Sequence, residues 1–457
     1  MTMNRNEAAD YEALLVDQLR GRLTLLQSQA EKEEVIEGIL NVAAGSDDKE
    51  RLKKGLGHLH GNREEKTRFI RDFLSYGILE DLLCDSEVED IIINSLNTIY
   101  VHHSQKGLIA TGRKFQSQKE IDLFVKKLIL FSGRDEFKKI MNLELPNLEG
   151  RANIVLSPFG PQITITKAKV EPLSIIDLIK RESLTFEVAA QLWLYLEGLS
   201  IKPANVIIAG GPGTGKTTLL NALFCFIPSS ERMVLIEDTL ELNTFLEDSC
   251  SRLESDDEIS LAHLVKNSLR MRPDRIVVGE VRGEEARDMI TAVNVGKYCL
   301  GTIHASTARE AILRLQNEPM NVPEILVNLI DVFVIMKRFH VRDKVFRVVD
   351  EVSETGGMEQ KTVLLSQIFK YDYERKAIRS ITTSTVYRDR LARSAGLTPR
   401  DIIDEVDVRA LALKTLAEKG IHTMKEITVF CRAYNRNPKA VLASIGLDRD
   451  ELIRNRK

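Results

Sequence analysis

The stretch GGPGTGKTTLLNAL, at residues 210–223, decides the fold of this chain. Its glycine and lysine spacing fits G-x-x-x-x-G-K-[ST], in which backbone N–H groups converge on phosphate oxygens and the next helix points its positive end at the same anion. The apolar run ANVIIAG precedes it and a helical pattern follows, as this motif requires. We therefore predict a phosphate-binding loop rather than an ordinary glycine-rich turn. Its expected binding residues are Gly210, Gly211, Pro212, Gly213, Thr214, Gly215, Lys216, Thr217 and Thr218.

Two side chains of this loop have distinct expected roles. Lys216 reaches the β and γ phosphates as a point charge. The hydroxyl of Thr217 is placed to ligate a magnesium ion that the phosphates share. ATP and Mg²⁺ are therefore the expected cofactors.

Acidic residues follow two later apolar runs. RMVLIEDTLEL ends its run at Glu237 and Asp238, and RPDRIVVGEVRGEE ends its run at Glu280. The carboxyl ends of strands in an open parallel sheet share one crevice, so both sites would face the metal and the γ phosphate. Each acid could merely cap a helix or solvate a turn. Two such sites after a phosphate loop favour metal binding by one carboxylate and activation of the attacking water by another.

A histidine follows a further short apolar run in LGTIHASTARE. A lone histidine is more often structural, but the small residues after His304 leave this strand end open. The open strand end permits a polar contact from His304 to the γ phosphate or to Glu280, which makes this histidine a candidate sensor of bound triphosphate.

The length of 457 residues indicates two or three domains. Changes in pattern predict an α/β chain with five parts. These are an N-terminal helical segment (1–65), an α+β domain (66–168), a linker with one short helix (169–185), an ATPase domain (186–346) and a mostly helical C-terminal extension (347–457). Within the α+β domain, VEDIIINSLNTIYVHH predicts paired strands, and Ser117 with Glu120 predicts a capping box at the start of an amphipathic helix.

Composition narrows the function classes. A net charge of -3 gives no global field for nucleic acid, so no nucleic-acid partner is expected, although a local basic patch stays open. Five scattered cysteines without a CxxC pair indicate reduced thiols and no structural zinc. No apolar stretch approaches the roughly 20 residues that a membrane-spanning helix needs. We expect a cytoplasmic protein whose membrane association is peripheral.

Three blocks in this order resemble the Walker A, aspartate-box, Walker B and histidine-box motifs of the secretion motor ATPase superfamily. They are GGPGTGKTTLLNAL, RMVLIEDTLEL and residues 267–310. That superfamily serves type II and type IV secretion, type IV and tight-adherence pili, and the archaeal flagellum. LRLQNEPMNVPEI and the helical tail most resemble its archaeal branch.

The resemblance implies a homohexameric ring whose subunits join an N-terminal domain to a RecA-like ATPase domain, with nucleotide between the two. It implies that Glu237 activates water, that Glu280 holds the metal with Thr217, and that His304 is the box histidine. The implied partners are a polytopic membrane platform protein and filament or secretion machinery.

The chain departs from the superfamily at one strand of the N-terminal domain. Relatives often carry an arginine in an ITIRKF strand, where this chain reads ITITKA with Thr166. Arginine fingers can be worth several powers of ten in rate, so that contact must come from elsewhere. Arg151 and Arg134 match other arginines of this domain, and Lys167 is a weaker substitute.

The leading hypothesis is a hexameric motor that hydrolyses ATP to drive assembly or disassembly of a pilus-like filament, or secretion. One alternative is a nucleotide-responsive scaffold of a membrane complex that hydrolyses poorly. The other is a RecA-like motor that translocates DNA, against which the neutral composition weighs.

Overall fold

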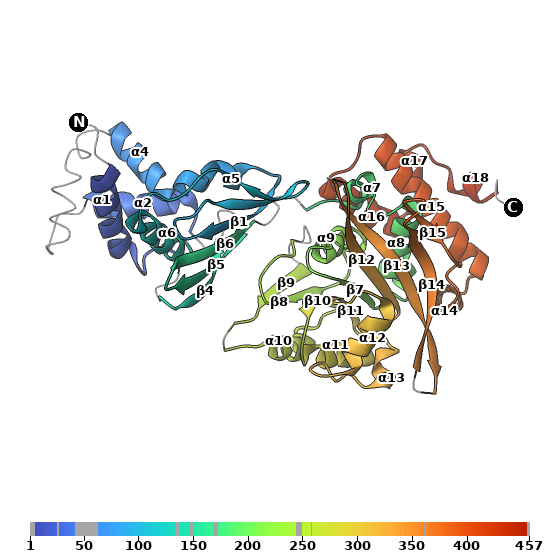
Figure 1. Ribbon diagram of the computed structural model, residues 1–457. Helices are drawn as coiled ribbons and strands as arrows, with labels where there is room; N and C mark the ends of the chain where they lie inside the picture. Colours follow the sequence, from blue (N-terminus) through green and yellow to red (C-terminus); the bar gives the residue numbers. More distant parts are fainter. Residues whose placement is uncertain are drawn as a thin grey trace. The chain divides into compact units, whose positions relative to one another are not determined.

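The computed structural model describes residues 5–24, 27–41, 63–133, 137–145, 150–167, 172–243, 249–256, 258–342, 344–360 and 362–454. The chain divides into two compact units, Met1–Val170 and Glu171–Lys457 (Figure 1). Each unit has its own hydrophobic core.

The first unit contains an antiparallel sheet of six strands in the order β3-β2-β1-β6-β5-β4. The predicted pairing within residues 88–103 is confirmed, because β1 pairs with β2. The strands are β1 (Val88–Asn94), β2 (Tyr100–His103), β3 (Gly107–Ala110), β4 (Ile140–Leu145), β5 (Gly150–Ser157) and β6 (Gly160–Thr166). The helices are α1 (Arg5–Leu19), α2 (Gln29–Asn41), α4 (Arg63–Leu74), α5 (Glu80–Cys84) and α6 (Gln118–Phe131).

Helix α6 begins where the sequence predicts, but its capping box is only half formed. The side chain of Ser117 accepts from the backbone N–H of Glu120, while the Glu120 carboxylate accepts from Gln116 rather than from Ser117. The N-terminal helices pack into the core of this unit, where Leu15 and Ile36 are fully buried.

The second unit is built on a nine-stranded sheet in the order β15-β14-β13-β12-β7-β11-β10-β8-β9. The strands from β12 to β9 run parallel, and β13 to β15 extend the sheet as an antiparallel meander. The strands are β7 (Val206–Gly210), β8 (Met233–Glu237), β9 (Cys250–Glu254), β10 (Arg275–Val281), β11 (Tyr298–Ile303), β12 (Val332–Val341), β13 (Lys344–Glu359), β14 (Thr362–Asp372) and β15 (Ala377–Ser380).

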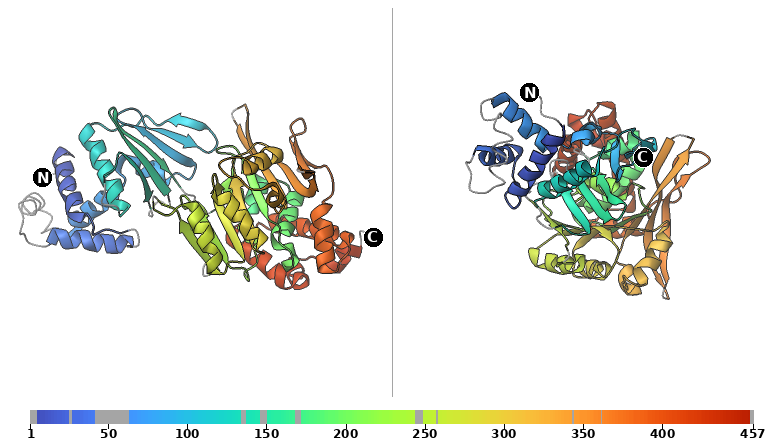
Figure 2. Two further views of the ribbon diagram at one scale, coloured as in Figure 1. Left: turned by 90° about the horizontal axis from the view of Figure 1, so that it is seen from below. Right: turned by 60° about the vertical axis from the view of Figure 1, so that its left-hand side comes forward.

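Helices cover both faces of this sheet (Figure 2). Val206 and Ile208 of β7 face a core formed with α7, α8, α9 and the C-terminal helices, whereas Ile207 and Ala209 face α10 to α13. The helices are α7 (Ile175–Lys180), α8 (Phe186–Glu197), α9 (Lys216–Leu223), α10 (Leu261–Ser268), α11 (Glu285–Asn294), α12 (Ala308–Gln316), α13 (Glu324–Val327), α14 (Val386–Ala395), α15 (Pro399–Glu418), α16 (Met424–Arg436), α17 (Pro438–Ser444) and α18 (Arg449–Arg454).

One expected boundary differs from the observed elements. The boundary at residue 347 falls inside β13, so the C-terminal extension is helical only from Val386 onward. The expected linker contains α7, the short helix that the sequence predicts there. A Ser174 capping box starts α7, and Ile175 and Ile176 are buried in the core of the second unit. Both segments are mixed in charge along the chain, yet both contain buried residues, which in β13 include Asp350 and Glu354.

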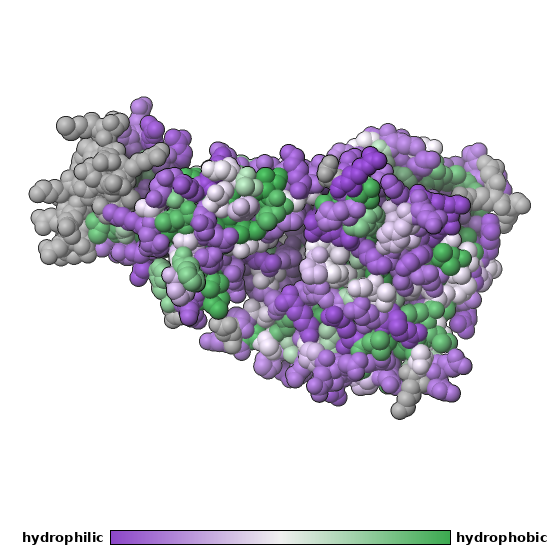
Figure 3. Space-filling view, in the orientation of Figure 1, coloured by the Kyte–Doolittle hydropathy of each residue, from purple (hydrophilic) through white to green (hydrophobic). Residues whose placement is uncertain are grey.

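Hydrophilic residues cover most of the face that Figure 3 shows. Among the described residues, none of the helices combines the length and the apolar character needed to cross a bilayer.

Candidate functional site

The glycine loop connects β7 to α9 and requires its glycines for two physical reasons. Gly213 and Gly215 have φ values of 66° and 93°, a left-handed region that favours glycine. At Gly210 the reason is space, because an added Cβ would lie 2.5 Å from the Thr214 hydroxyl and 2.7 Å from the Met336 carbonyl oxygen. The loop therefore has the close backbone approach that phosphate binding needs.

Lys216 begins α9 and is only 8% exposed. Its Nζ donates to the carbonyl oxygen of Gly211 over 3.1 Å, and the Thr214 hydroxyl donates to the same oxygen over 2.8 Å. Burial lowers the pKa of Lys216, and the charge of Glu280 opposes that shift. Thr217 and Thr218 are half-buried in the first turn of α9, while Pro212 is exposed at the surface of the loop.

Glu237 is the last residue of β8 and is 2% exposed. Its Oε1 accepts from the backbone N–H groups of Glu241 and Leu242, at 3.0 and 2.9 Å. Its Oε2 is buried and has no hydrogen bond partner within the described part of the chain, and a guanidinium nitrogen of Arg252 lies 4.0 Å away. Burial raises the pKa of Glu237 to about 7, although the two backbone hydrogen bonds act to lower this pKa.

Glu280 lies near the end of β10, between an arginine and a histidine. Its Oε2 accepts from Arg282, which also approaches Asp238 at 3.8 Å. The Nε2 of His304 lies 2.7 Å from Glu280 Oε1, a close electrostatic contact. Burial would raise the pKa of Glu280, but the charges of Arg282, His304 and Lys216 outweigh it and lower the pKa. Burial and Lys216 lower the pKa of His304.

The sheet brings these strand ends together beside the loop. β8 and β10 are neighbours, and a Cβ on Gly279 would lie 2.9 Å from Cγ of Glu237. The hydroxyl of Thr302, near the end of β11, donates to the Gly279 carbonyl oxygen. Glu237, Glu280 and His304 therefore lie together at the carboxyl ends of neighbouring strands, and the charge of Lys216 acts on Glu280. The two glutamates differ in the direction of their pKa shifts.

The donor set fits a magnesium ion held at a phosphate loop. The described residues contain no group of three His, Cys, Asp or Glu side chains arranged as a metal site. Mg²⁺ at nucleotide phosphates does not need one, because it takes one or two protein oxygens and completes its shell with phosphate and water. Thr217 and Glu280 are hard oxygen donors of the kind this chemistry uses.

The expected arginines belong to the first unit. Arg151 lies on β5 at the register position opposite Glu144 of β4 and Thr166 of β6. Thr166 donates to Asp90, and Lys167 donates to the backbone carbonyl of Asp85, so both side chains have partners within that unit. Arg134 lies outside the described residues.

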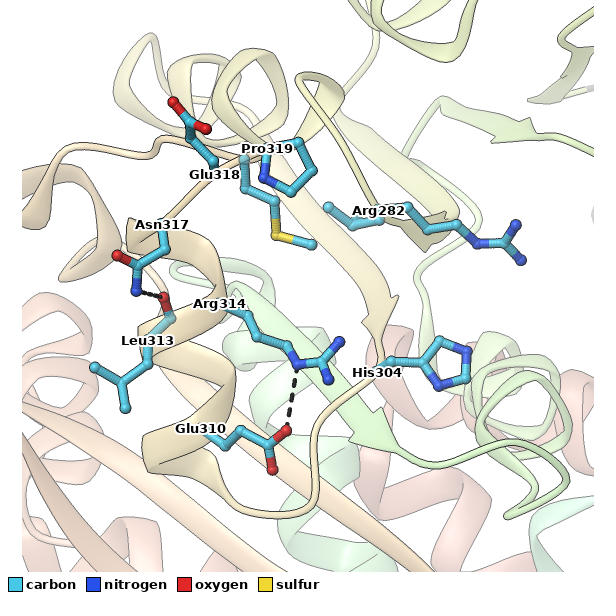
Figure 4. Close-up of a pocket in the computed structure, with 10 residues that line it drawn as sticks. Arg282, His304, Glu310, Leu313, Arg314, Asn317, Glu318 and Pro319 are labelled. Carbon is cyan, nitrogen blue, oxygen red and sulfur yellow. Dashed lines mark hydrogen bonds and ion pairs between the residues drawn. The ribbon is translucent and has the colours of Figure 1, made fainter.

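Sequence reasoning missed Arg282, which lies just after the end of β10 and contacts Glu280. The signal available in the sequence was a basic residue two positions after the acid that ends the apolar run. Arg282 and His304 also reach the rim of a cavity of about 500 Å³ beside α12 (Figure 4). Arg314 of α12 contacts Glu310 there at 3.2 Å.

The strand order defines a class of protein. One strand, β11, separates the loop-bearing β7 from the acidic β10, and β12 flanks β7 on its other side. This order, with a phosphate loop between β7 and α9, is that of the RecA-like class of P-loop folds. The predicted fold class is confirmed: a RecA-like domain, an α+β N-terminal unit and a helical C-terminal region.

The chain belongs to the Type II/IV secretion system protein family, which its residues 141–358 match. An uncharacterized protein of Methanocaldococcus jannaschii is 32% identical over 379 residues, covering 78% of this chain and 68% of the relative. The conjugal transfer protein TrbB of Rhizobium radiobacter is 32% identical over 248 residues, covering 52% of this chain and 75% of TrbB. A crystal structure of the pilus retraction motor PilT with bound ADP covers 82% of this chain and 99% of PilT, at 17% identity and a TM-score of 0.45. The family match and the similarity to TrbB confirm the expected resemblance to the secretion motor superfamily.

Proposed function

We propose that this chain is a magnesium-dependent ATP hydrolase that acts as the motor of a secretion or pilus-assembly machine. The observation that carries the proposal is the convergence of Lys216, Glu237 and Glu280 beside one phosphate loop. Membership of the secretion family supports the biological setting.

The residues divide the chemistry between them. The loop N–H groups and Lys216 bind the phosphates, and a bound Mg²⁺, held by Thr217 and Glu280, would neutralise charge on the β and γ oxygens. Glu237 accepts the proton of the attacking water at Oε2, the oxygen left without a hydrogen bond partner in the described chain. His304 responds to the γ phosphate through its contact with Glu280.

The finer assignments follow the family. We propose a homohexamer on the cytoplasmic side of a membrane, in which nucleotide turnover moves the two units of each subunit relative to their neighbours. A polytopic membrane platform protein would transmit that movement to a filament or to secretion machinery. The arginines Arg151 and Arg134 would complete the nucleotide site from the first unit.

Lys216→Ala tests the first step. The variant should lose phosphate release by at least about 100-fold, because the loop would lose the point charge that holds the β and γ phosphates. Lys266→Ala is the matched control, since Lys266 is a 61% exposed side chain on α10 that pairs with Asp288. Retained turnover in Lys216→Ala would overturn the proposal, and a wild-type burst without steady turnover would favour the scaffold alternative.

A further inference from the structure

Strand β12 runs past the end of β7 and carries an arginine alongside the phosphate loop. Met336 of β12 pairs with Gly210, the last residue of β7. Side chains two residues apart on a strand share a face, so Arg338 follows Met336 on the face that borders the loop. Nη1 of Arg338 lies 3.2 Å from the position that a Cβ would take on Gly213.

A second arginine reaches the same point from β13. Arg347 lies directly opposite Arg338 in the antiparallel pair. Its Nε donates to the carbonyl oxygen of Gly213 over 2.9 Å, and its Cδ lies 3.7 Å from the Cβ position of Gly215. One hairpin of the subunit therefore directs two guanidinium groups at the middle of its own phosphate loop.

Arg338 has unused hydrogen bond donors beside the loop. Among the described residues, no carboxylate forms an ion pair with Arg338. Nε of Arg338 is buried and lacks a hydrogen bond partner among the residues that the structure describes. A guanidinium group has five N–H donors and favours phosphate oxygens as acceptors. An anion in the loop would use these donors.

We propose that Arg338 is a further polyphosphate-binding residue of the same subunit, and that Arg347 is a positioning residue that holds the loop through Gly213. The inference rests on the proposed function for the identity of the ligand, a nucleoside polyphosphate. It deepens that function by assigning cationic groups within the second unit, separate from Arg151 of the first unit. The hairpin thereby links the antiparallel part of the sheet to nucleotide binding.

The direct test is nucleotide affinity of the full-length chain, measured by calorimetry with ATP and with ADP in the presence of Mg²⁺. Arg338→Gln should weaken both affinities about tenfold, the scale of one partly exposed charge-assisted hydrogen bond. The affinities of Arg338→Lys should lie between those of the wild type and Arg338→Gln, because lysine keeps the charge but lacks the several N–H donors of the guanidinium group. Arg342→Gln is the control, since Arg342 is exposed at the turn of the same hairpin and should leave affinity unchanged.

The melting temperature without nucleotide separates binding from a structural role. Arg338→Gln removes a guanidinium group that has no ion-pair partner in the described chain, so its unliganded melting temperature should equal or exceed that of the wild type. Wild-type nucleotide affinity in Arg338→Gln would overturn the inference, whatever the melting temperature of this variant. If the wild-type chain itself binds no ATP, the proposed function fails instead.

Arg347 requires a different measurement, because it acts through the loop. Arg347→Gln should lower kcat by about tenfold while the affinity for ADP changes less than about threefold, since a misplaced loop misaligns the reacting phosphate. Arg347→Lys should restore part of kcat. Equal losses of kcat and of ADP affinity in Arg347→Gln, with no recovery of kcat in Arg347→Lys, would contradict a positioning role.

Discussion

Two glutamates at neighbouring strand ends have opposite surroundings. Glu237 is 2% exposed and faces Arg252 only at 4.0 Å, so burial dominates and its pKa rises. Glu280 touches Arg282 and His304, and these contacts with the charge of Lys216 lower its pKa. Pairs of acids whose surroundings separate their pKa values divide catalytic roles. Glu280 stays ionised and suits a cation, whereas Glu237 suits proton transfer near neutral pH.

The pH dependence of turnover follows from Glu237. A general base must be ionised, so kcat/KM should rise with pH through about 7, the pKa of Glu237, and level off above it. Glu237→Gln should lower kcat by at least about 100-fold, and the residual activity should no longer rise with pH through about 7. Glu284→Gln, an exposed neighbour of the site, is the control and should keep the wild-type profile.

The same carboxylate should cost stability. Its folded-state pKa lies above the ordinary value of 4.5, so folding favours the protonated form, and stability falls as pH rises from about 4.5 to about 7. Glu237→Gln should therefore raise the melting temperature at pH 8 while removing activity. A variant that loses activity and also melts lower at pH 8 would indicate a structural role for this glutamate.

Among the elements, the C-terminal helix α15 is tied to helix α8 by a buried arginine. Arg409 of α15 is 1% exposed and pairs with Glu197 of α8 at 2.7 Å and with Glu405 at 3.0 Å. Its guanidinium carbon also lies 4.8 Å from the ring centroid of Trp193. Helices α8 and α15 therefore share a charged core, and the C-terminal region is an integral part of the second unit.

Breaking this network should be costly. Arg409→Met keeps the apolar volume but leaves Glu197 and Glu405 buried with less compensation, which costs on the order of 3–5 kcal/mol. The expected result is a clear drop in the melting temperature, measured by circular dichroism. Lys414→Ala, an exposed position on the same helix, should change the melting temperature little. An unchanged melting temperature in Arg409→Met would show that packing alone holds α15.

Elements with local signals could be predicted from the sequence, and those with long-range causes could not. The loop between β7 and α9 and the start of α6 at Ser117 follow from neighbouring residues. β13 was missed because charged residues interrupt its apolar ones, such as Val349 and Val352, which are buried by helices and strands distant in the sequence. Arg347 meets Gly213 across 134 residues, a contact that only the strand order creates.

At the scale of the whole molecule, the phosphate loop and the candidate arginine finger belong to different units. Lys216 belongs to the second unit and Arg151 to the first. Thr166, which stands where the superfamily resemblance implies an arginine, donates to Asp90. The charge that would neutralise the transition state must therefore come from another residue of the first unit or from the second unit itself.

Subunit mixing distinguishes these sources. Arg151→Ala and Lys216→Ala should each hydrolyse ATP poorly as pure proteins. In a head-to-tail ring assembled from equal amounts of both, about a quarter of the sites would combine an intact loop with an intact Arg151 from a neighbour. The mixture should therefore recover about a quarter of wild-type turnover. A mixture with no more activity than its parts would place Arg151 beside its own loop, and full activity of Arg151→Ala alone would assign transition-state neutralisation to the second unit.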